Sequence, residues 1–308
     1  MTTLVYSHDA SARHQTPPGH PERVERLVAV ELGLRGLHVE RLGQPLGAQA
    51  DVLRCHPASY ADFIHASEPV AEIIQLDPDT WMSPGSYEAA LRAVGGACAA
   101  VDAVLAGQAH NAFVVARPPG HHALAETAMG FCLFGTVAIA AKRALDHHGL
   151  SRVAVVDFDV HHGNGTQALL WNEPRAFFAT SQQMPLWPGS GDANERGAHG
   201  QIVNLPLPPG SDGAHMRAAY EAQIFPALAA FKPELILISA GFDAHADDPL
   251  AQLNWLPADY AWLTHRLCDL ADTHAQGRVV SCLEGGYDLA ALTASVAAHV
   301  AVLQERGR

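Results

Sequence analysis

The segment RVAVVDFDVHHGNG, residues 152–165, joins a run of apolar residues to a cluster of Asp, His and Gly. Its first half, Arg152–Phe158, is almost continuously apolar, which is typical of a strand covered on both faces. Such strands belong mainly to parallel sheets, whose strands are connected by helices. The segment therefore predicts an α/β fold, with polar chemistry placed where a buried strand ends.

The rest of the chain repeats this alternation of strand and helix. Further strands are predicted at Leu4–Ser7, Ala112–Ala116, Ala176–Thr180, Leu235–Ser239 and Arg278–Leu283. Helices are predicted at Ser86–Leu105, Val137–His148, Asp212–Ala230, Pro257–Ala275 and Leu289–Arg306. Pro226 should kink or shorten the third of these helices, because proline lacks the backbone N–H that a helix interior requires. With neither an internal repeat nor a polar linker, residues 1–308 are expected to form a single α/β domain.

Charge and cysteine usage exclude several classes of protein. Lys and Arg total 19 against 32 Asp and Glu, and the net charge of -13 argues against binding nucleic acid or an anionic membrane. The five cysteines form no CxxC pair, which argues against a zinc ribbon or a disulfide framework. The N-terminus lacks a secretion-signal pattern, and the longest apolar stretch, 131–141, is too short to span a bilayer. We expect a cytoplasmic protein.

Unusual residues follow four of the predicted strands. These segments are Arg117–His122, Asp157–Gly165, Ala240–His245 and Glu284–Asp288. In open parallel sheets, ligands bind beyond the carboxyl ends of the strands. The sequence therefore predicts that these four segments meet in one pocket.

Asp159 and His161 are two residues apart, so in an extended chain both side chains point the same way. With Asp243 from another strand end they form a carboxylate–imidazole–carboxylate set, and three protein ligands leave a position open for water, as catalytic zinc requires. Fe²⁺, Mn²⁺ and Co²⁺ also accept such ligands, so the spacing alone does not select the metal.

Each of these features also has a purely structural interpretation. A DxD pair at a strand end or Asp243 alone can cap a turn or a helix, and His121-His122 can be a buried hydrogen-bonded pair. Gly-Gly-Tyr287 can simply turn the chain. Their occurrence together at four strand ends favours a functional site.

The chemistry of this set fits a metal-dependent amidase. A bound metal polarises a carbonyl and lowers the pKa of water, and one of the two histidines can carry the proton from water to the leaving amine. Tyr287 can donate a hydrogen bond to the developing oxyanion, and Asp157 can orient one of the histidines.

As an ordered set, the motifs resemble the histone deacetylase superfamily, including bacterial class II histone-deacetylase-like amidohydrolases and acetylpolyamine amidohydrolases. The resemblance extends from Gly19-His20-Pro21-Glu22-Arg23 to Gly285-Gly286-Tyr287-Asp288. Between them lie RPPGHH (117–122), GFCLF (130–134), DFDVHHGNGTQ (157–167), WPGSG (187–191) and SAGFDAHADDPL (239–250). The resemblance implies the arginase/deacetylase fold, in which a parallel sheet of about eight strands lies between helices.

The resemblance also implies roles for individual residues. The zinc ligands would be Asp159, His161 and Asp243, and Fe²⁺ or Co²⁺ could replace zinc. The remaining catalytic residues would be His122 as general base and acid, His121 as its electrostatic partner, Asp157 and Asn164 as the carboxylate and amide that hold these histidines, and Tyr287 as the group that polarises the carbonyl.

The substrate channel and a second ion site follow from the same resemblance. Phe131 and Trp187 would form the aromatic walls of an acyl-lysine tunnel beside Gly130, with Leu250 at its rim and Asp79 as the rim aspartate. Arg23 resembles the arginine beneath the site. A structural potassium ion would be held by the backbone oxygens of Asp157, Asp159 and His161, together with Thr180.

Two positions depart from the family pattern. Gly135 stands where many members have Asn, and Gln182 where many have His. Neither departure removes a ligand or a proton carrier, but both are expected to alter loop support and substrate choice.

Four functions remain open at this point. The first is a zinc-dependent deacylase of acyl-lysine, and the second is a deacetylase of small acetylated polyamines, which the apolar rim residue Leu250 disfavours. The third is a ureohydrolase with two metals, which Gly163 and His245 disfavour because that site needs carboxylates there. The fourth is a binding or sensor protein without activity. The expected partner is an acylated lysine peptide or a small N-acyl amine, and a homo-oligomer is possible.

Overall fold

The fold is built on one parallel sheet. The computed structural model describes residues 2–307, so Met1 and Arg308 of the expected 1–308 domain lie outside the described residues. The strand order is β2-β1-β5-β10-β9-β6-β7-β8, and all the neighbouring pairs are parallel. The strands are β1 (Thr3–Ser7), β2 (Val39–Gly43), β5 (Asn111–Val114), β6 (Val153–Asp157), β7 (Ala176–Gln183), β8 (Ile202–Leu207), β9 (Leu235–Ala240) and β10 (Val279–Leu283). The expected α/β class with about eight parallel strands is confirmed.

The six strands predicted from sequence are all present, whereas the two at the sheet edges, β2 and β8, were missed. Every residue of β6, β9 and β10 is buried, while β2 is half-buried or exposed along its length. An edge strand is not covered on both faces, so its sequence lacks the continuous apolar run that identified the central strands.

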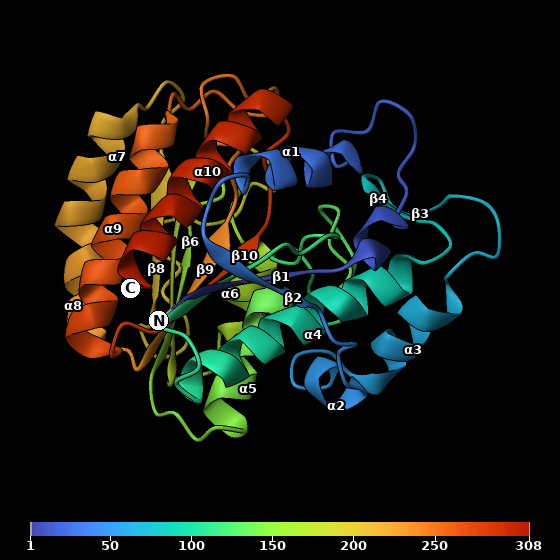
Figure 1. Ribbon diagram of the computed structural model, residues 1–308, viewed down its shortest axis with the longest axis horizontal. Helices are drawn as coiled ribbons and strands as arrows, with labels where there is room; N and C mark the ends of the chain where they lie inside the picture. Colours follow the sequence, from blue (N-terminus) through green and yellow to red (C-terminus); the bar gives the residue numbers. More distant parts are fainter. Residues whose placement is uncertain (1, 308) are drawn as a thin grey trace.

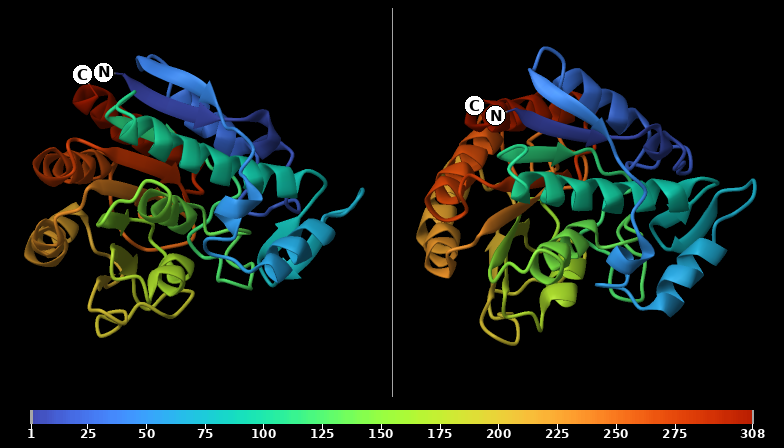
Figure 2. Two further views of the ribbon diagram at one scale, coloured as in Figure 1. Left: turned by 90° about the horizontal axis from the view of Figure 1, so that it is seen from below. Right: turned by 60° about the horizontal axis from the view of Figure 1, so that its bottom comes forward.

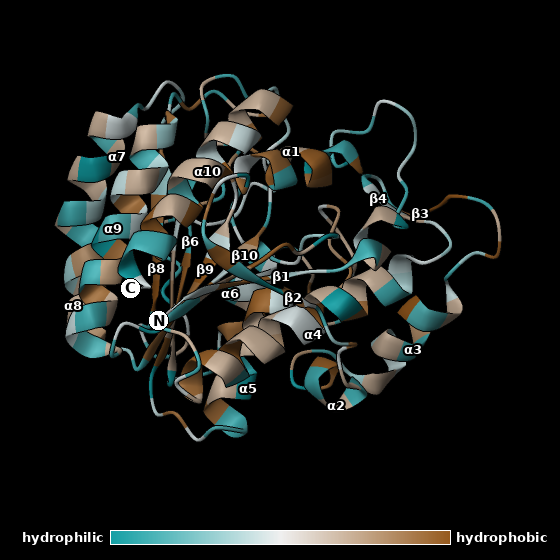
Figure 3. Cartoon of the chain, in the orientation of Figure 1, coloured by the Kyte–Doolittle hydropathy of each residue, from teal (hydrophilic) through white to brown (hydrophobic). Residues whose placement is uncertain are grey.

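Helices cover both faces of the sheet (Figures 1 and 2). Helices on one face contribute to a core with the sheet, and they are α1 (Glu25–Gly33), α7 (Gly213–Ala219), α8 (Phe225–Phe231), α9 (Pro257–His274) and α10 (Leu289–Arg306). On the other face a second core includes α4 (Ser86–Leu105), α5 (Thr136–Asp146) and α6 (Asn164–Leu170). Figure 3 shows mainly hydrophobic residues on the central strands, whereas hydrophobic and hydrophilic residues alternate along the helices that cover them.

The helix predicted at Asp212–Ala230 is divided into three parts. Between α7 and α8 lies a π-type turn, η2 (Tyr220–Ile224), closed by the Phe225 N–H bonding to the carbonyl of Tyr220. Pro226 stands in the first turn of α8, where its missing N–H leaves no bond unmade. Pro226 was expected to kink or shorten the helix, but the helical segments continue without a gap to Phe231, and the π segment just before the proline accommodates it.

A smaller group of elements lies beside the sheet and was not predicted. It comprises the one-turn helices η1 (Asp9–Ala12) and α2 (Gln49–Val52), α3 (Ala58–Ala66), and the hairpin of β3 (Ile74–Asp77) and β4 (Thr80–Met82). Residues of α2, α3 and β4 share a third core with Leu133 and Phe134, so this group supports the loop that follows β5. Within residues 2–307, the helices are all too short or too polar to cross a bilayer.

Candidate active site and metal centre

The four segments singled out in the sequence follow four adjacent strands. The strands β5, β10, β9 and β6 are consecutive in the middle of the sheet. Because the strands are parallel, their carboxyl ends lie at one edge of the sheet, and the four segments, which begin at Arg117 and end at Asp288, meet there. The expected convergence on one rim is present.

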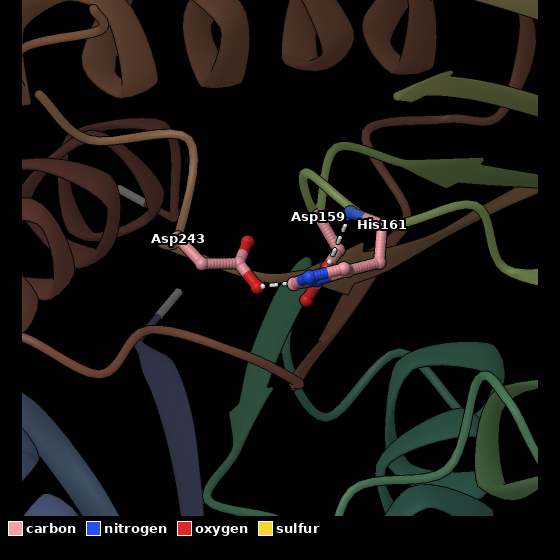
Figure 4. A group of neighbouring side chains, drawn as sticks. All are labelled: Asp159, His161 and Asp243. Carbon is pink, nitrogen blue, oxygen red and sulfur yellow. Dashed lines mark hydrogen bonds and ion pairs between the residues drawn. The ribbon is translucent and has the colours of Figure 1, made fainter. Parts of the chain in front are cut away.

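Asp159, His161 and Asp243 form a buried cluster at this edge (Figure 4). Each offers a ligand atom, and these atoms all lie within 4.8 Å of one another. The Nδ1 atom of His161 is 3.1 Å from Oδ1 of Asp159 and 3.1 Å from Oδ2 of Asp243. Among residues 2–307, this is the one cluster of three or more His, Cys, Asp and Glu side chains with metal-binding geometry.

Backbone hydrogen bonds, rather than strand alternation, orient these ligands. β6 ends at Asp157, so Asp159 and His161 lie beyond the extended strand. Oδ1 of Asp159 accepts the N–H of His161 at 2.9 Å, and Oδ1 of Asp243 accepts the N–H of Val160 at 2.8 Å. The expectation that both side chains share a direction is met, but the physical cause is a carboxylate-bonded turn.

Burial and mutual contact shift the pKa values of this cluster. Burial disfavours a charge on His161, but hydrogen bonds to Asp159 and Asp243 raise its pKa to about 10. Burial and the Asp159 carboxylate raise the pKa of Asp243 to about 7. The two carboxylates thus favour a positive charge between them, which agrees with a donor set that could hold a cation.

Two glycines leave room for these carboxylates. A Cβ atom on Gly241 would lie 2.0 Å from Oδ2 of Asp159, and one on Gly285 would lie 2.2 Å from Oδ2 of Asp243. Any side chain at either position would displace a carboxylate of the cluster. Glycine at positions 241 and 285 thus leaves the space that the carboxylates of Asp159 and Asp243 occupy. Two carboxylates and an imidazole are donors that fit the expected metal.

The two adjacent histidines have different partners. Nδ1 of His121 is 3.0 Å from Oδ2 of Asp157, whereas Nδ1 of His122 is 2.8 Å from Oδ1 of Asn164. Their rings are 3.8 Å apart between centroids. A carboxylate therefore faces one ring and a neutral amide the other.

These partners separate the pKa values of the two histidines. Burial disfavours a charge on His121, but the carboxylates of Asp159, Asp157 and Glu284 overcome it and raise the pKa well above its usual value. Burial lowers the pKa of His122, and the neighbouring His121 lowers it further. The neutral form is therefore favoured at His122 and the protonated form at His121.

Tyr287 stands beside the metal cluster and lines the same cavity as His122 and His161. Burial, with the carboxylates of Asp243 and Asp159, raises the pKa of its phenol well above 10. The hydroxyl is therefore a permanent hydrogen-bond donor. The arginine beneath it is Arg26, whose guanidinium carbon lies 5.1 Å from the centre of the Tyr287 ring.

The assignment of Arg23 to the position beneath the site was wrong, because its side chain is exposed. Arg26 is fully buried and donates to the carbonyls of Glu284 and Gly286 and to Glu22. Arg23 precedes α1 and faces solvent, whereas Arg26 lies in the first turn of the helix and is buried, and the motif alone does not distinguish them.

All five residues expected to bind substrate line one cavity, of about 230 Å³, together with His122, His161, Leu186 and Tyr287. Those five are Asp79, Gly130, Phe131, Trp187 and Leu250. The volume is below the roughly 300–1,000 Å³ of common ligand pockets, so the cavity suits a slender chain. Trp187 is 42% exposed, which places it at the mouth.

The channel wall at Gly130 and Phe131 has an unusual backbone. Both residues have positive φ, 57° and 68°, which is rare for phenylalanine. Oδ1 of Asp79 accepts the N–H of Gly130 at 3.0 Å, and Oγ1 of Thr80 accepts the N–H of Phe131 at 3.1 Å. The β3–β4 turn thus holds the conformation that aims the Phe131 ring into the channel.

With this geometry established, comparisons with known proteins identify the family. The family model described as "Histone deacetylase domain" matches residues 18–303. The chain belongs to the histone deacetylase family. The solved structure "Crystal Structure of HDA15 HD domain" superimposes with a TM-score of 0.93 at 30% sequence identity, covering 99% of this chain and 89% of that one.

Several relatives in this family have names that describe an activity. A "Histone deacetylase-like amidohydrolase" of Pseudomonas aeruginosa is 40% identical, over 90% of this chain and 73% of the relative. A "Probable deacetylase" of Archaeoglobus fulgidus is 39% identical, over 94% of this chain and 82% of the relative. The human "Polyamine deacetylase HDAC10" is 36% identical, over 98% of this chain and 48% of the relative.

The two departures from the histone deacetylase pattern have local explanations. The N–H of Gly135 donates to Nε2 of His56 at 2.9 Å, and a Cβ there would lie 2.4 Å from Cδ1 of Leu169. The amide nitrogen of Gln182 donates to the carbonyl of Gly191 at 2.7 Å, behind the WPGSG loop. Both positions support loops and neither lines the cavity.

Sequence reasoning quoted Glu284 and Asp248 within motifs but gave them no role. Oε2 of Glu284 accepts the N–H groups of Gly120 and His121, at 2.7 and 3.2 Å. Asp248 accepts the N–H of Tyr287 at 2.7 Å. The available signal was an acid beside Gly or Pro in a histone deacetylase motif, but these partners lie in the loop that follows a different strand.

Proposed function

We propose that this chain is a zinc-dependent deacylase that hydrolyses the amide of an acyl-lysine side chain or a similar N-acyl amine. The observation that carries the proposal is that one narrow cavity is lined by a metal-cluster residue, His161, a neutral base, His122, and a protonated phenol, Tyr287. Membership of the histone deacetylase family and the names of its relatives support a deacetylase or amidohydrolase activity.

Asp159, His161 and Asp243 would hold the zinc ion, and Fe²⁺ or Co²⁺ could occupy the same donors. When bound, the ion supplies Lewis-acid polarisation of the acyl carbonyl and lowers the pKa of water. Oxygens of Asp159 and Asp243 already accept backbone N–H groups, which fixes the direction of both carboxylates before any ion arrives.

His122 would carry the proton. Because its Nδ1–H faces the Asn164 amide oxygen, the free lone pair is on Nε2. Nε2 accepts a proton as the water oxygen bonds to the acyl carbon. The same proton then passes to the nitrogen as the C–N bond breaks, which releases a carboxylic acid and an amine. The acid keeps the second hydrogen of the water and then gives that proton to the amine, so the final products are a carboxylate and an ammonium ion.

His121 and Tyr287 would stabilise charge during these steps. His121, held by Asp157, keeps a positive charge beside His122 and favours the return of the proton to the leaving nitrogen. The Tyr287 hydroxyl donates to the oxygen that becomes negative as the carbonyl is attacked.

The channel favours a lysine-like chain. Phe131 and Trp187 offer aromatic walls to a methylene stem, and Leu250 places an apolar side chain at the rim. The rim carboxylate of Asp79 has one oxygen bonded to Gly130 and Thr80, and its other oxygen can accept a substrate N–H.

The alternative function is deacetylation of a polyamine or another small amide. It is favoured by the 36% identity to the human polyamine deacetylase and by the carboxylate of Asp79 in the cavity lining. Leu250 opposes it, because an apolar rim offers nothing to a second ammonium group.

Two other functions have less support. A two-metal ureohydrolase would need further carboxylates at Gly163 and His245. An inactive sensor would be expected to have lost a ligand or Tyr287, and the chain retains them all.

A potassium site beside the zinc site is a further part of the proposal. Asp157 and Thr180 are paired in register on β6 and β7, and Oγ1 of Thr180 is buried without a hydrogen-bond partner. An ion bound by this hydroxyl and the backbone oxygens of Asp157, Asp159 and His161 would satisfy it. A single catalytic domain, a homo-oligomer and a cytoplasmic location stay predictions.

The deciding experiment measures acid release by zinc-loaded protein from an acetyl-lysine peptide and from N-acetylated polyamines at equal concentrations. Faster peptide turnover supports the lysine deacylase, and faster polyamine turnover supports the alternative. The proposal would be overturned if the zinc-bound protein hydrolysed neither of these substrates nor amides with longer acyl chains. The metal-free protein and Tyr287→Phe are the controls for adventitious hydrolysis.

A further inference from the structure

One buried carboxylate connects the channel rim to the candidate carbonyl-polarising tyrosine. Asp248 lies in the loop after β9 and is 6% exposed. Its Oδ1 accepts the N–H of Leu250 at 3.0 Å, and its Oδ2 accepts the N–H of Tyr287 at 2.7 Å and that of Asp288 at 3.4 Å. Both oxygens are therefore bonded to backbone whose side chains line the cavity or adjoin it.

The segment that carries Tyr287 needs such support. It follows two glycines, and Gly286 has φ of 120°, a region open to glycine but strained for other residues. Glycine restricts the backbone least of all residues, so neighbouring contacts must fix the direction of the next side chain.

Arg26 holds this segment as a hydrogen-bond donor, and Asp248 holds it as an acceptor. Arg26 donates to the carbonyls of Glu284 and Gly286, and Asp248 accepts the amides of Tyr287 and Asp288. After this point the side chain of Asp288 caps α10 by accepting the N–H of Ala291. Tyr287 is thus fixed by a donor before it, an acceptor at its own N–H, and a helix after it.

We propose that Asp248 is a positioning residue that fixes Tyr287 and Leu250 together. This inference rests on the proposed function. By sharing one carboxylate, the rim loop and the tyrosine keep a constant spacing, so the acyl carbonyl meets the phenol hydroxyl when the substrate stem lies against Leu250. Asp248 itself is absent from the cavity lining, so it acts through the two residues that it bonds.

Asp248→Asn tests this role with little change in size. Asparagine has one acceptor oxygen, so its NH₂ group must face the N–H of either Tyr287 or Leu250, and that bond is lost. We expect kcat for the acyl-lysine peptide to fall roughly tenfold to a hundredfold, as displacement of a reacting group by about 1 Å typically does. Asp247→Asn is the matched control. It makes the same change of charge at the neighbouring residue, whose side chain is 75% exposed.

Comparison with Tyr287→Phe separates positioning from general destabilisation. If Asp248 acts through the phenol, adding Asp248→Asn to Tyr287→Phe should lower kcat by less than about twofold, because neighbours that act as a unit are not additive. The inference would be overturned if the losses in kcat of Asp248→Asn and Tyr287→Phe were fully additive. It would also be overturned if Asp248→Asn alone had the same kcat as Asp247→Asn.

A second measurement does not depend on activity. Hydrogen exchange in zinc-loaded Asp248→Asn should be faster than in the parent and Asp247→Asn in a peptide spanning 284–290 or in one spanning 246–252, because the N–H of either Tyr287 or Leu250 loses its acceptor. Unchanged exchange in both peptides would overturn the positioning role. If the parent protein hydrolyses no acyl amide, the proposed function fails, and the exchange result still decides whether Asp248 holds Tyr287.

Discussion

The Nδ1 atom of His122 lies 2.8 Å from the amide oxygen of Asn164. An amide oxygen can only accept a hydrogen bond, so Nδ1 carries the proton and Nε2 has the free lone pair. The Asn164 amide nitrogen contacts the Met129 sulfur at 3.5 Å, which agrees with this orientation. An Asp at this position would add a charge, and the amide avoids it while still selecting the tautomer that a general base requires.

Replacement of His122 should therefore lower kcat more than replacement of its partner, Asn164. His122→Ala removes the proposed proton carrier, and we expect kcat to fall by a factor of about 10²–10⁴. Asn164→Ala leaves the imidazole in place and should cost less. The measurement is kcat of both variants on the acetyl-lysine peptide at equal zinc occupancy, and the reverse order would contradict the assignment.

Removal of a ligand carboxylate should abolish metal binding. Asp159→Ala and Asp243→Ala each leave two protein ligands, so zinc measured by elemental analysis after dialysis should fall from one equivalent to near zero. Asp247→Ala, which removes an exposed carboxylate nearby, should retain the metal. Stoichiometric zinc in both ligand variants would refute the site.

Tyr287→Phe should retain zinc but lose most turnover. The phenyl ring keeps the packing against Phe131 and Arg26, and only the hydroxyl is removed. Loss of one oxyanion donor typically lowers kcat by about 10²–10³. A variant with normal zinc and near-normal kcat would remove Tyr287 from the mechanism.

A charge at the rim should move selectivity toward polyamines. Leu250→Glu places a carboxylate where a second ammonium would pass, and a partly exposed ion pair contributes about 0.2–1 kcal/mol, which corresponds to at most about fivefold. The ratio of kcat/KM for N-acetylated polyamine to that for acetyl-lysine peptide should rise accordingly. Leu250→Gln, which is polar but uncharged, is the control, and an equal rise in it would exclude a charge effect.

Acid stability should depend on His56, which is buried beside the loop that carries Phe131. Burial lowers its pKa to about 4 from a usual value of 6.5, while Nδ1 bonds to the carbonyl of Ala125 and Nε2 to the N–H of Gly135. Below pH 6.5 the unfolded chain binds a proton at His56 that the folded protein does not. The folded state therefore loses stability as pH falls from 6.5 to 4, by up to roughly 3 kcal/mol.

His56→Gln offers one donor and one acceptor but does not titrate. Denaturant unfolding at pH 7 and pH 4.5 should show a smaller loss of stability in this variant than in the parent. His38→Gln changes an exposed histidine and should keep the parent's pH dependence. An unchanged loss in His56→Gln would show that other groups cause the acid sensitivity.

The sequence predicted the central strands because burial on both faces leaves a visible apolar run. It missed β2, whose exposed edge position removes that signal. It found Asp159, His161, Asp243 and Tyr287 because their motifs are local, and the rule for parallel strands brought them to one rim. It chose Arg23 over Arg26, since the side chain that enters the interior is selected by the packing of α1 and not by the motif.

The sequence by itself determined the α/β class, the order of the strand-end motifs and the chemical types of the candidate site residues, because these depend on periodicity and local spacing. The tertiary structure decided which partner faces each group. The carboxylate of Asp157 beside His121, the amide of Asn164 beside His122 and the carboxylate of Asp248 beneath Tyr287 all join residues at least 36 positions apart. Hydrogen bonds depend on distances of a few tenths of an ångström, and only the packed sheet brings these atoms within that range.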